Sequence, residues 1–188
     1  MADVWLISGI PGAGKTTVGR LLAGRFERSA FIEGDRLQEW IVSGNVWPRT
    51  EPAEEASRQV DLNTHNQCLL ARSYAEAGFT PIIDYPIISR EGLHTYREAL
   101  AGLTIHFVVL HPGTAVAIAR DADREKSRHH QAKYGRTIGE HYAHLAQPLV
   151  EQLSGVGLWI DNARLTPEAT VEAILADRER ARLDERRT

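Results

Sequence analysis

Eight consecutive residues near the N-terminus have the types and spacing of a loop that binds phosphate. The segment 9–16 reads G-I-P-G-A-G-K-T and fits the pattern G-x-x-x-x-G-K-(S/T) in full. Glycines let backbone N–H groups turn toward phosphate oxygens, and the start of the following helix adds unpaired donors. Lys15 can reach the β- and γ-phosphates, and the Thr16 hydroxyl can ligate Mg²⁺. The sequence thus predicts a nucleotide site made by Gly9, Pro11, Gly12, Ala13, Gly14, Lys15, Thr16 and Thr17.

Two aspartates follow apolar runs that read as strands. Asp35 comes two residues after the run 30–33, and Asp84 ends the run 80–84. Ligands of parallel sheets sit beyond the carboxyl ends of the strands, so both carboxylates are expected to face the phosphate loop. Asp35 could take the proton of an attacking hydroxyl, or it could simply cap a helix. Asp84 could hold Mg²⁺ or orient an acceptor, or it could satisfy turn amides, whereas strand alternation is expected to turn Glu33 away.

Three arginines at four-residue spacing indicate a basic stripe on one predicted helix, 114–131. They are Arg120, Arg124 and Arg128, and the surrounding segment 120–136 has more basic than acidic residues. Such a segment can close over a triphosphate and neutralise charge that develops during phosphoryl transfer. We therefore expect a lid over about 120–136, with Arg120 and Arg124 acting in catalysis. The alternative is a solvated helix with internal ion pairs.

Aromatic residues near the second and third strands are candidates for an acceptor pocket. Trp40 and Trp47 lie in the polar segment of about 36–66, which we expect to bind the acceptor, and Tyr85 follows Asp84. Aromatic side chains can equally belong to the core.

Strands and helices alternate along the chain. Strands are expected at about 4–8, 30–33, 80–84, 104–110 and 158–161, and helices at about 16–26, 54–77, 90–101, 114–131, 137–153 and 167–182. Continuous apolar strands separated by helices predict a parallel sheet covered on both faces, which is the α/β class. The expected core positions of the helix 54–77 are Val60, Leu62, Leu69, Leu70 and Tyr74.

Composition limits the partners that the chain can have. It has 188 residues, 43% of them hydrophobic, which fits a single domain over 1–188. A net charge of −3 gives no general attraction to nucleic acid, and no apolar run is long enough to cross a membrane. The N-terminus does not read as a secretion signal and Cys68 is the single cysteine, so a cytoplasmic location is expected. The oligomeric state is left open.

The missing guanine-reading segment N-K-x-D argues against a GTPase, and a small kinase is the leading class. At this point the chain resembles the chloramphenicol phosphotransferase family of P-loop small-molecule kinases, which is related to gluconate kinases and tunicamycin-resistance-like proteins. The resemblance runs in order through the loop 9–16, Gly-Asp-x-Leu at 34–37, PIID at 81–84, the stretch 107–124 and the stretch 159–174.

The resemblance implies a P-loop NTPase fold, with a five-stranded parallel sheet in the order 2-3-1-4-5 flanked by helices and a small helical lid. It implies ATP and Mg²⁺ as cofactors and transfer of the γ-phosphoryl group to a hydroxyl of a small organic molecule. Asp35 matches the family's base, Arg120 and Arg124 match lid arginines, and Asp161 and Asn162 begin a loop near adenine. The third strand departs from the chloramphenicol enzymes, because Asp84-Tyr85 stands where they tend to have two acids.

The expected function is therefore an ATP-dependent O-phosphotransferase, with an antibiotic as one candidate acceptor in a resistance role. One alternative is a gluconate-like carbohydrate kinase. An alternative of another class is a nucleotide-gated binding protein in which the segment 40–66 contacts a partner. A nucleoside monophosphate kinase and a polynucleotide kinase are disfavoured, the latter by the net charge.

Overall fold

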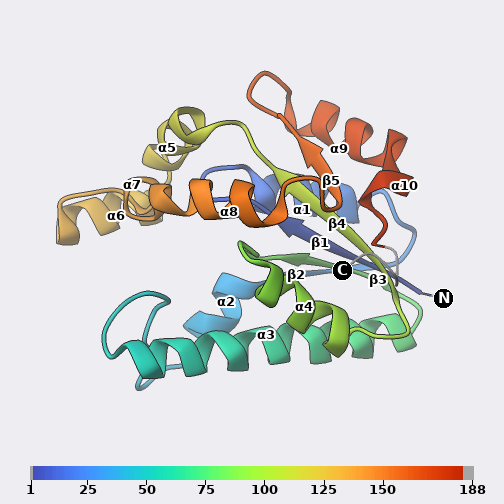
Figure 1. Cartoon of the computed structure of the whole chain (residues 1–188), viewed down its shortest axis with the longest axis horizontal. Coiled ribbons are helices and arrows are strands. Elements are labelled where there is room, and N and C mark those ends of the chain that lie inside the picture. The colour runs from blue at the N-terminus through green and yellow to red at the C-terminus, as the bar shows by residue number, and fades with distance from the viewer. Residues whose placement is uncertain (1, 184–188) are drawn as a thin grey trace.

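A computed structural model describes residues 2–183 and contains a five-stranded parallel sheet in the order β2-β3-β1-β4-β5 (Figure 1). The strands are β1 (Asp3–Ser8), β2 (Ser29–Glu33), β3 (Thr80–Asp84), β4 (Thr104–Leu110) and β5 (Leu158–Ile160). Both the predicted fold class and the predicted strand order are confirmed.

Helices connect the strands and cover both faces of the sheet (Figure 1). They are α1 (Lys15–Ala23), α2 (Gly34–Glu39), α3 (Ala53–Glu76), α4 (Arg90–Ala99), α5 (Thr114–Ala122), α6 (Glu125–Tyr134), α7 (Ile138–Tyr142), the 3₁₀ turn η1 (Ala143–Leu145), α8 (Ala146–Leu153), α9 (Pro167–Ala176) and α10 (Arg178–Ala181).

Alternation along the strands divides the core into two layers. In β1, Val4 and Leu6 pack with residues of α3, α4 and α8, whereas Trp5 and Ile7 pack with residues of α1 and α9. All four side chains are fully buried. A strand covered on both faces must be apolar on both, which is why the central strands read as continuous apolar runs.

Several predicted helices are shorter or interrupted. The predicted helix 114–131 is two helices, α5 and α6, because Arg124 has extended backbone angles. The predicted helix 137–153 is divided into α7, η1 and α8. The first helix ends at Ala23 rather than near Phe26, and the last is interrupted at Asp177.

Of the five predicted core positions of α3, Leu70 packs against the core and Val60 is half-buried, but the other three are exposed. Leu62, Leu69 and Tyr74 are 42%, 53% and 41% exposed, so these expected core positions were wrong. The buried residues of α3 are instead small or polar: Ala56, Gln59, Asn63, Thr64, Gln67, Cys68, Ala71 and Ala75. The polar residues Gln59 and Asn63 face α2, whereas Cys68 and Ala71 pack with residues of the sheet, against which α3 lies (Figure 1).

Within residues 2–183, no helix is both long and apolar enough to cross a lipid bilayer.

Candidate active site

The loop 9–14 leaves β1 and enters α1 in a conformation that depends on glycine. Gly12 and Gly14 have φ angles of 83° and 98°, in the left-handed region that side chains other than glycine rarely adopt. A Cβ on Gly12 would overlap the carbonyl oxygen of Ala117 in α5. The motif predicts the glycine at position 14, whereas Gly12 stands at a variable position of the motif and is required here by the close approach of α5.

A cleft of about 390 Å³ opens beside this loop. Its walls come from the loop and α1, from the end of α5, and from the segment after β5. The lining residues are Gly12, Gly14, Lys15, Thr16, Thr17, Val18, Arg120, Arg124, Asn162, Leu165, Pro167 and Thr170. The structure thus brings the predicted phosphate-loop residues together with both predicted arginines.

Arg120 joins two walls of the cleft. Its guanidinium donates to the carbonyl oxygens of Asn162 and Ala163 at 2.9 and 3.1 Å. Asn162 is buried and its amide donates to the Ala13 carbonyl at 3.0 Å. Asp161 is exposed, and its carboxylate accepts from the Ala163 N–H at 3.0 Å, outside the cleft lining. Of the predicted adenine-side pair, Asn162 faces the cleft and Asp161 shapes the turn.

Lys15 and Asp84 face each other at the carboxyl ends of β1 and β3. Burial lowers the pKa of Lys15, an effect that the fields of Asp84 and Asp35 oppose. Burial raises the pKa of Asp84, while Lys15 and a hydrogen bond from Thr16 oppose that change. Both charged groups are thus held in a desolvated place where they interact strongly. Such perturbed groups in a cleft are typical of functional sites.

Thr16 and Asp84 form a donor set suited to Mg²⁺. The Thr16 hydroxyl donates to a carboxylate oxygen of Asp84 at 2.6 Å. Mg²⁺ prefers hard oxygen ligands and is commonly held by one or two carboxylates together with water and substrate phosphates. These oxygens, at the start of α1 and next to Lys15, fit such an ion.

Asp35 lies in the first turn of α2, beyond the end of β2. Its carboxylate is half-exposed and lies 3.3 Å from the ammonium of Lys126 in α6. Glu33, two residues earlier, pairs with Arg20 at 2.6 Å instead. The fields of both Asp35 and Lys126 act on Lys15, so the loop, α2 and α6 converge on one place.

The break between α5 and α6 is built around a buried carboxylate. Asp121 is fully buried, accepts the Ser127 hydroxyl, and accepts the Gly139 N–H at 2.6 Å. Arg124, at the break, lies 3.6 Å from the other oxygen of Asp121. The three arginines consequently do not share one helical stripe: Arg120 and Arg124 line the cleft, whereas Arg128 is exposed on α6.

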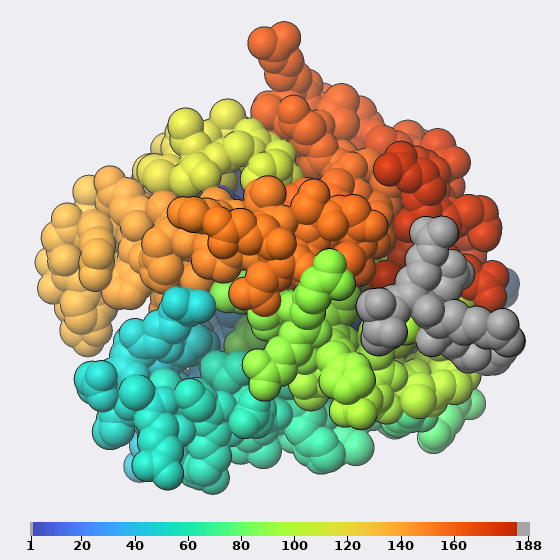
Figure 2. Space-filling model, in the orientation of Figure 1, coloured from blue at the N-terminus to red at the C-terminus, as the bar shows by residue number. Residues whose placement is uncertain are grey.

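The predicted acceptor aromatics occupy different environments. Tyr85 is buried at 8% exposure, Trp47 is 39% exposed, and Trp40 is 70% exposed on the surface at the end of α2. Figure 2 shows a hollow between the segment 41–52 and the segment that contains α7 and η1. The fields of Asp35 and Tyr142 act on Tyr85, and Trp47 directly precedes Pro48, whose carbonyl contacts Tyr142. None of the three predicted aromatics lines the cleft of about 390 Å³, and Trp40, directly after α2, is largely exposed to solvent.

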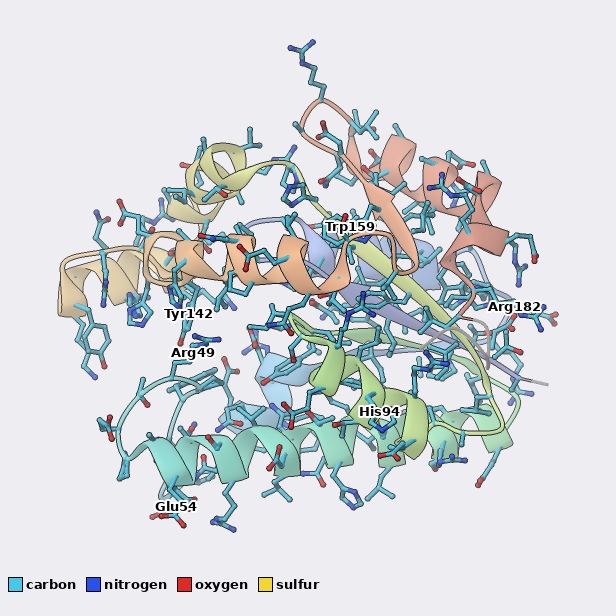
Figure 3. The ribbon with its side chains drawn as sticks, in the orientation of Figure 1. Arg49, Glu54, His94, Tyr142, Trp159 and Arg182 are labelled. Carbon is cyan, nitrogen blue, oxygen red and sulfur yellow. The ribbon has the colours of Figure 1, made fainter. Side chains whose placement is uncertain are left out.

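Two contacts bridge this hollow from the segment 41–52 to the segment that contains α7 and η1. The Tyr142 hydroxyl donates to the Pro48 carbonyl at 3.1 Å, and the Arg49 guanidinium lies 3.4 Å from the His144 ring. Figure 3 shows Arg49 pointing toward Tyr142 across the gap. Arg49 has a left-handed backbone φ of 63°, which is unusual for a residue other than glycine.

The sequence did not single out three residues of this region as site residues: Lys126, Asp121 and Tyr142. Lys126 belongs to the predicted lid, but its pairing with Asp35 depends on how α6 folds back over α2. Asp121 and Tyr142 had no motif to mark them. A buried acid inside an otherwise solvated-looking helix leaves no local signal in sequence.

The model of a family described as AAA domain matches residues 4–149. Curated protein sequences give no match to this chain.

Several solved structures share the fold. A sugar kinase from Janibacter sp. HTCC2649 superposes with a TM-score of 0.64 at 22% identity, covering 94% of each chain. A gluconokinase from Sinorhizobium meliloti 1021 gives a TM-score of 0.59 at 20% identity, covering 95% of this chain and 92% of the other. The Deinococcus radiodurans tunicamycin resistance protein gives 0.63 at 19%, covering 94% and 95%.

These structures include the kinds of protein that the sequence resembles, so the predicted relationship is confirmed. Because the family model matches well over half of the residues, from β1 through the phosphate loop to α8, the chain belongs to this P-loop family of AAA domain proteins.

Proposed function

We propose that this protein is an ATP-dependent phosphotransferase that moves the γ-phosphoryl group of ATP to a hydroxyl of a small organic molecule. The observation that carries the proposal is the convergence of a phosphate loop, two arginines and two carboxylates at one end of the sheet. The names of the similar structures, a sugar kinase and a gluconokinase, support the choice of a kinase.

In the proposed reaction, Asp35 accepts the proton of the acceptor hydroxyl as its oxygen attacks the γ-phosphorus. A new O–P bond forms, the bond between the γ-phosphorus and the bridging oxygen breaks, and ADP leaves. The half-exposed carboxylate of Asp35 is reachable by an acceptor, which supports this role. Lys15, Arg120 and Arg124 neutralise the charge on the transferring group, because their positive groups line the cleft.

Thr16 and Asp84 would hold Mg²⁺, which when bound neutralises the phosphate oxygens and orients them. Asn162 and Arg120 join the segment after β5 to the loop, and we assign the nucleoside side of the cleft to them. The segment of about 36–66 and the lid of about 120–136 are assigned to acceptor binding and closure, respectively. The contacts of Pro48 and Arg49 with the far side of the hollow support the first assignment.

A mass-spectrometric screen tests the proposal. Purified protein, ATP and Mg²⁺ are incubated with pooled hydroxylated antibiotics, sugars and sugar acids, and Lys15→Ala is treated in parallel. The expected result is a product heavier by one phosphoryl group that is absent with the variant. The mass also separates the two acceptor classes, antibiotic and sugar acid.

ADP formation at one rate with and without every pool would contradict transfer to a small molecule. Together with a stable complex in a pull-down, that result would favour a nucleotide-gated binding protein instead.

A further inference from the structure

A cluster of buried amide side chains lies directly beneath the acceptor side of the site. Gln38 of α2 and Gln59, Asn63 and Gln67 of α3 are between 0% and 4% exposed, and we call these four residues the amide cluster. Their amides bond to one another: Gln38 donates to Gln59 at 2.9 Å, and Gln67 donates to Asn63 at 2.9 Å. Buried amides cost free energy unless they are hydrogen-bonded, and an apolar core would avoid that cost. The hydrogen bonds of the four amides therefore indicate a role beyond core packing.

One end of the amide cluster holds the backbone next to the proposed base. The Asn63 amide donates to the carbonyl oxygen of Gly34 at 2.9 Å, and Gly34 immediately precedes Asp35. The backbone is packed so tightly here that a Cβ on Gly34 would overlap the Tyr85 ring and lie 2.6 Å from the Gln67 amide nitrogen. The hydrogen bond from Asn63 and the packing of the Tyr85 ring thus hold the start of α2, and with it Asp35, in place.

The other end holds the segment 41–52. Gln38 donates to the Asn45 side chain at 3.0 Å and to the Val46 carbonyl at 3.1 Å. Gln59 accepts the Val46 N–H at 2.8 Å and donates to the Gly44 carbonyl at 2.7 Å. These four bonds fix both backbone groups of Val46, which lies just before Trp47, Pro48 and Arg49 on the rim of the hollow.

We propose that the amide cluster is a positioning device that holds the base and the acceptor-binding segment in one fixed relation. Asn63 positions Asp35 through the Gly34 carbonyl, and Gln38 with Gln59 positions the segment that contacts the acceptor. This inference rests on the proposed function and deepens it. It assigns specificity for the acceptor to buried residues that touch no substrate.

The two ends of the amide cluster predict different kinetic losses. Asn63→Asp replaces one NH₂ group by oxygen, so the bond to Gly34 is lost and the base shifts. We expect kcat to fall by about 10²-fold, the usual effect of a displacement near 1 Å, with KM for the acceptor nearly unchanged. Asn63→Leu, which has a similar shape and no charge, gives the same pattern if the aspartate variant does not fold.

Gln38→Glu removes the donors to Asn45, Val46 and Gln59 but still accepts from Asn63 at the 3.4 Å site. The segment 41–52 then loses both bonds from Gln38 and keeps those from Gln59, so it is held less firmly, while the Asn63–Gly34 bond remains. We expect KM for the acceptor to rise and kcat to change little. Tryptic cleavage after Arg49 should become about tenfold faster, because losing such hydrogen bonds favours local opening by about that factor.

Ser29→Ala is the matched control. It removes one hydrogen bond, from the Ser29 hydroxyl to the Ala23 carbonyl at 2.8 Å, at the opposite end of β2 from Gly34 and outside the amide cluster. We expect it to lower thermal stability like the other variants while leaving kcat, KM and cleavage after Arg49 unchanged. If the Asn63 variant, Gln38→Glu and the control variant all change kcat and KM only in proportion to their loss of stability, the positioning role is overturned.

These experiments can fail for the amide cluster and for the proposed function independently of each other. The acceptor is whichever compound the wild-type protein phosphorylates in the screen. If no compound is phosphorylated, the proposed function fails, whereas cleavage after Arg49 and hydrogen exchange of α2 still report on the amide cluster. Unchanged cleavage in Gln38→Glu and unchanged exchange in Asn63→Asp would then overturn its hold on these two elements.

Discussion

At the scale of single residues, the site depends on charges whose burial sets their interaction. Lys15 and Asp84 are both desolvated and each partly compensates the other's burial. Asp35, in contrast, is half-exposed and reaches the space where an acceptor could enter. The two carboxylates are therefore suited to different tasks: Asp84 to the cation beside Thr16, and Asp35 to the acceptor.

Replacing Asp35 should separate binding from chemistry. In Asp35→Asn, we expect nucleotide affinity to be retained and turnover to fall by about 10²–10⁴-fold, the usual contribution of a general base. Calorimetry with a non-hydrolysable ATP analogue and steady-state kinetics measure the two effects. Glu33→Gln is the control, because Glu33 pairs with Arg20 and should leave turnover unchanged. Normal turnover in Asp35→Asn would remove Asp35 from the role.

His106, in β4 beside Trp5 of β1, predicts a pH dependence of stability. It is buried, stacks on Trp5 at 4.3 Å between ring centroids, and lies 3.3 Å from the Asp3 carboxylate. Burial lowers the pKa of His106 below its usual 6.5, although Asp3 opposes this shift. The unfolded chain therefore takes up a proton that the folded chain does not, so acidification below about pH 6.5 destabilises the protein.

Urea unfolding at several pH values tests this expectation. The slope contributed by one such group is at most about 1.4 kcal/mol per pH unit, and it should disappear in His106→Phe. The phenylalanine keeps a ring against Trp5, so packing is largely retained. Parallel pH profiles for the wild type and the variant would contradict the assignment.

At the scale of elements, the turn between α5 and α6 decides where the arginines point. Asp121 holds the Ser127 hydroxyl and the Gly139 N–H, which brings the starts of α6 and α7 against the end of α5. Arg124 lies at the break with extended backbone angles, and it lines the cleft together with Arg120, whereas Arg128 is exposed on α6. A single buried carboxylate thus organises the predicted lid.

Asp121→Ala should lower the free energy of unfolding by about 3 kcal/mol, because buried donors and Arg124 lose their partner. Hydrogen exchange at the Gly139 amide should rise at the same time. Asp123→Ala is a matched control, since Asp123 is exposed at the end of α5, and a change within about 0.5 kcal/mol is expected. Equal effects of the two substitutions would exclude a special role for Asp121.

At the scale of the whole molecule, two contacts between segments far apart in the sequence bridge the hollow that we propose as the acceptor side. Tyr142 donates to Pro48, and Arg49 lies beside His144 (Figure 3). Burial raises the pKa of Tyr142, so the hydroxyl remains protonated and able to donate at neutral pH. The side of the sheet near α2 and the segment around α7 are joined over the hollow by these contacts.

Tyr142→Phe should weaken this closure. Losing one hydrogen bond costs about 1 kcal/mol, so KM for the acceptor should rise about fivefold while nucleotide affinity is unchanged. Tyr134→Phe, on an exposed tyrosine of α6, serves as the control with no expected effect. A parallel loss of nucleotide affinity in Tyr142→Phe would show that the contact holds the nucleotide cleft instead.

The sequence by itself determined the parallel sheet and the phosphate loop, whereas the strand order was predicted from the resemblance to P-loop kinases. Strands covered on both faces must be continuously apolar, and a loop that surrounds phosphate needs glycines at fixed positions, as Gly14 illustrates with its φ of 98°. Local physics therefore marks these features in the order of residues. The carboxylates Asp35 and Asp84 could be predicted for the same reason, since they follow strands that end at one edge.

Only the tertiary structure decided which face of α3 is buried and where the lid helix breaks. Hydrophobic spacing pointed to Leu62, Leu69 and Tyr74, yet the neighbour of that helix is α2, whose Gln38 presents amide groups rather than apolar surface. The repeat of Gln59, Asn63 and Gln67 at four-residue spacing was present in the sequence, but it identifies a buried face only once the partner is known. Similarly, Asp121 breaks a helix because Gly139 is near in space, which no local pattern records.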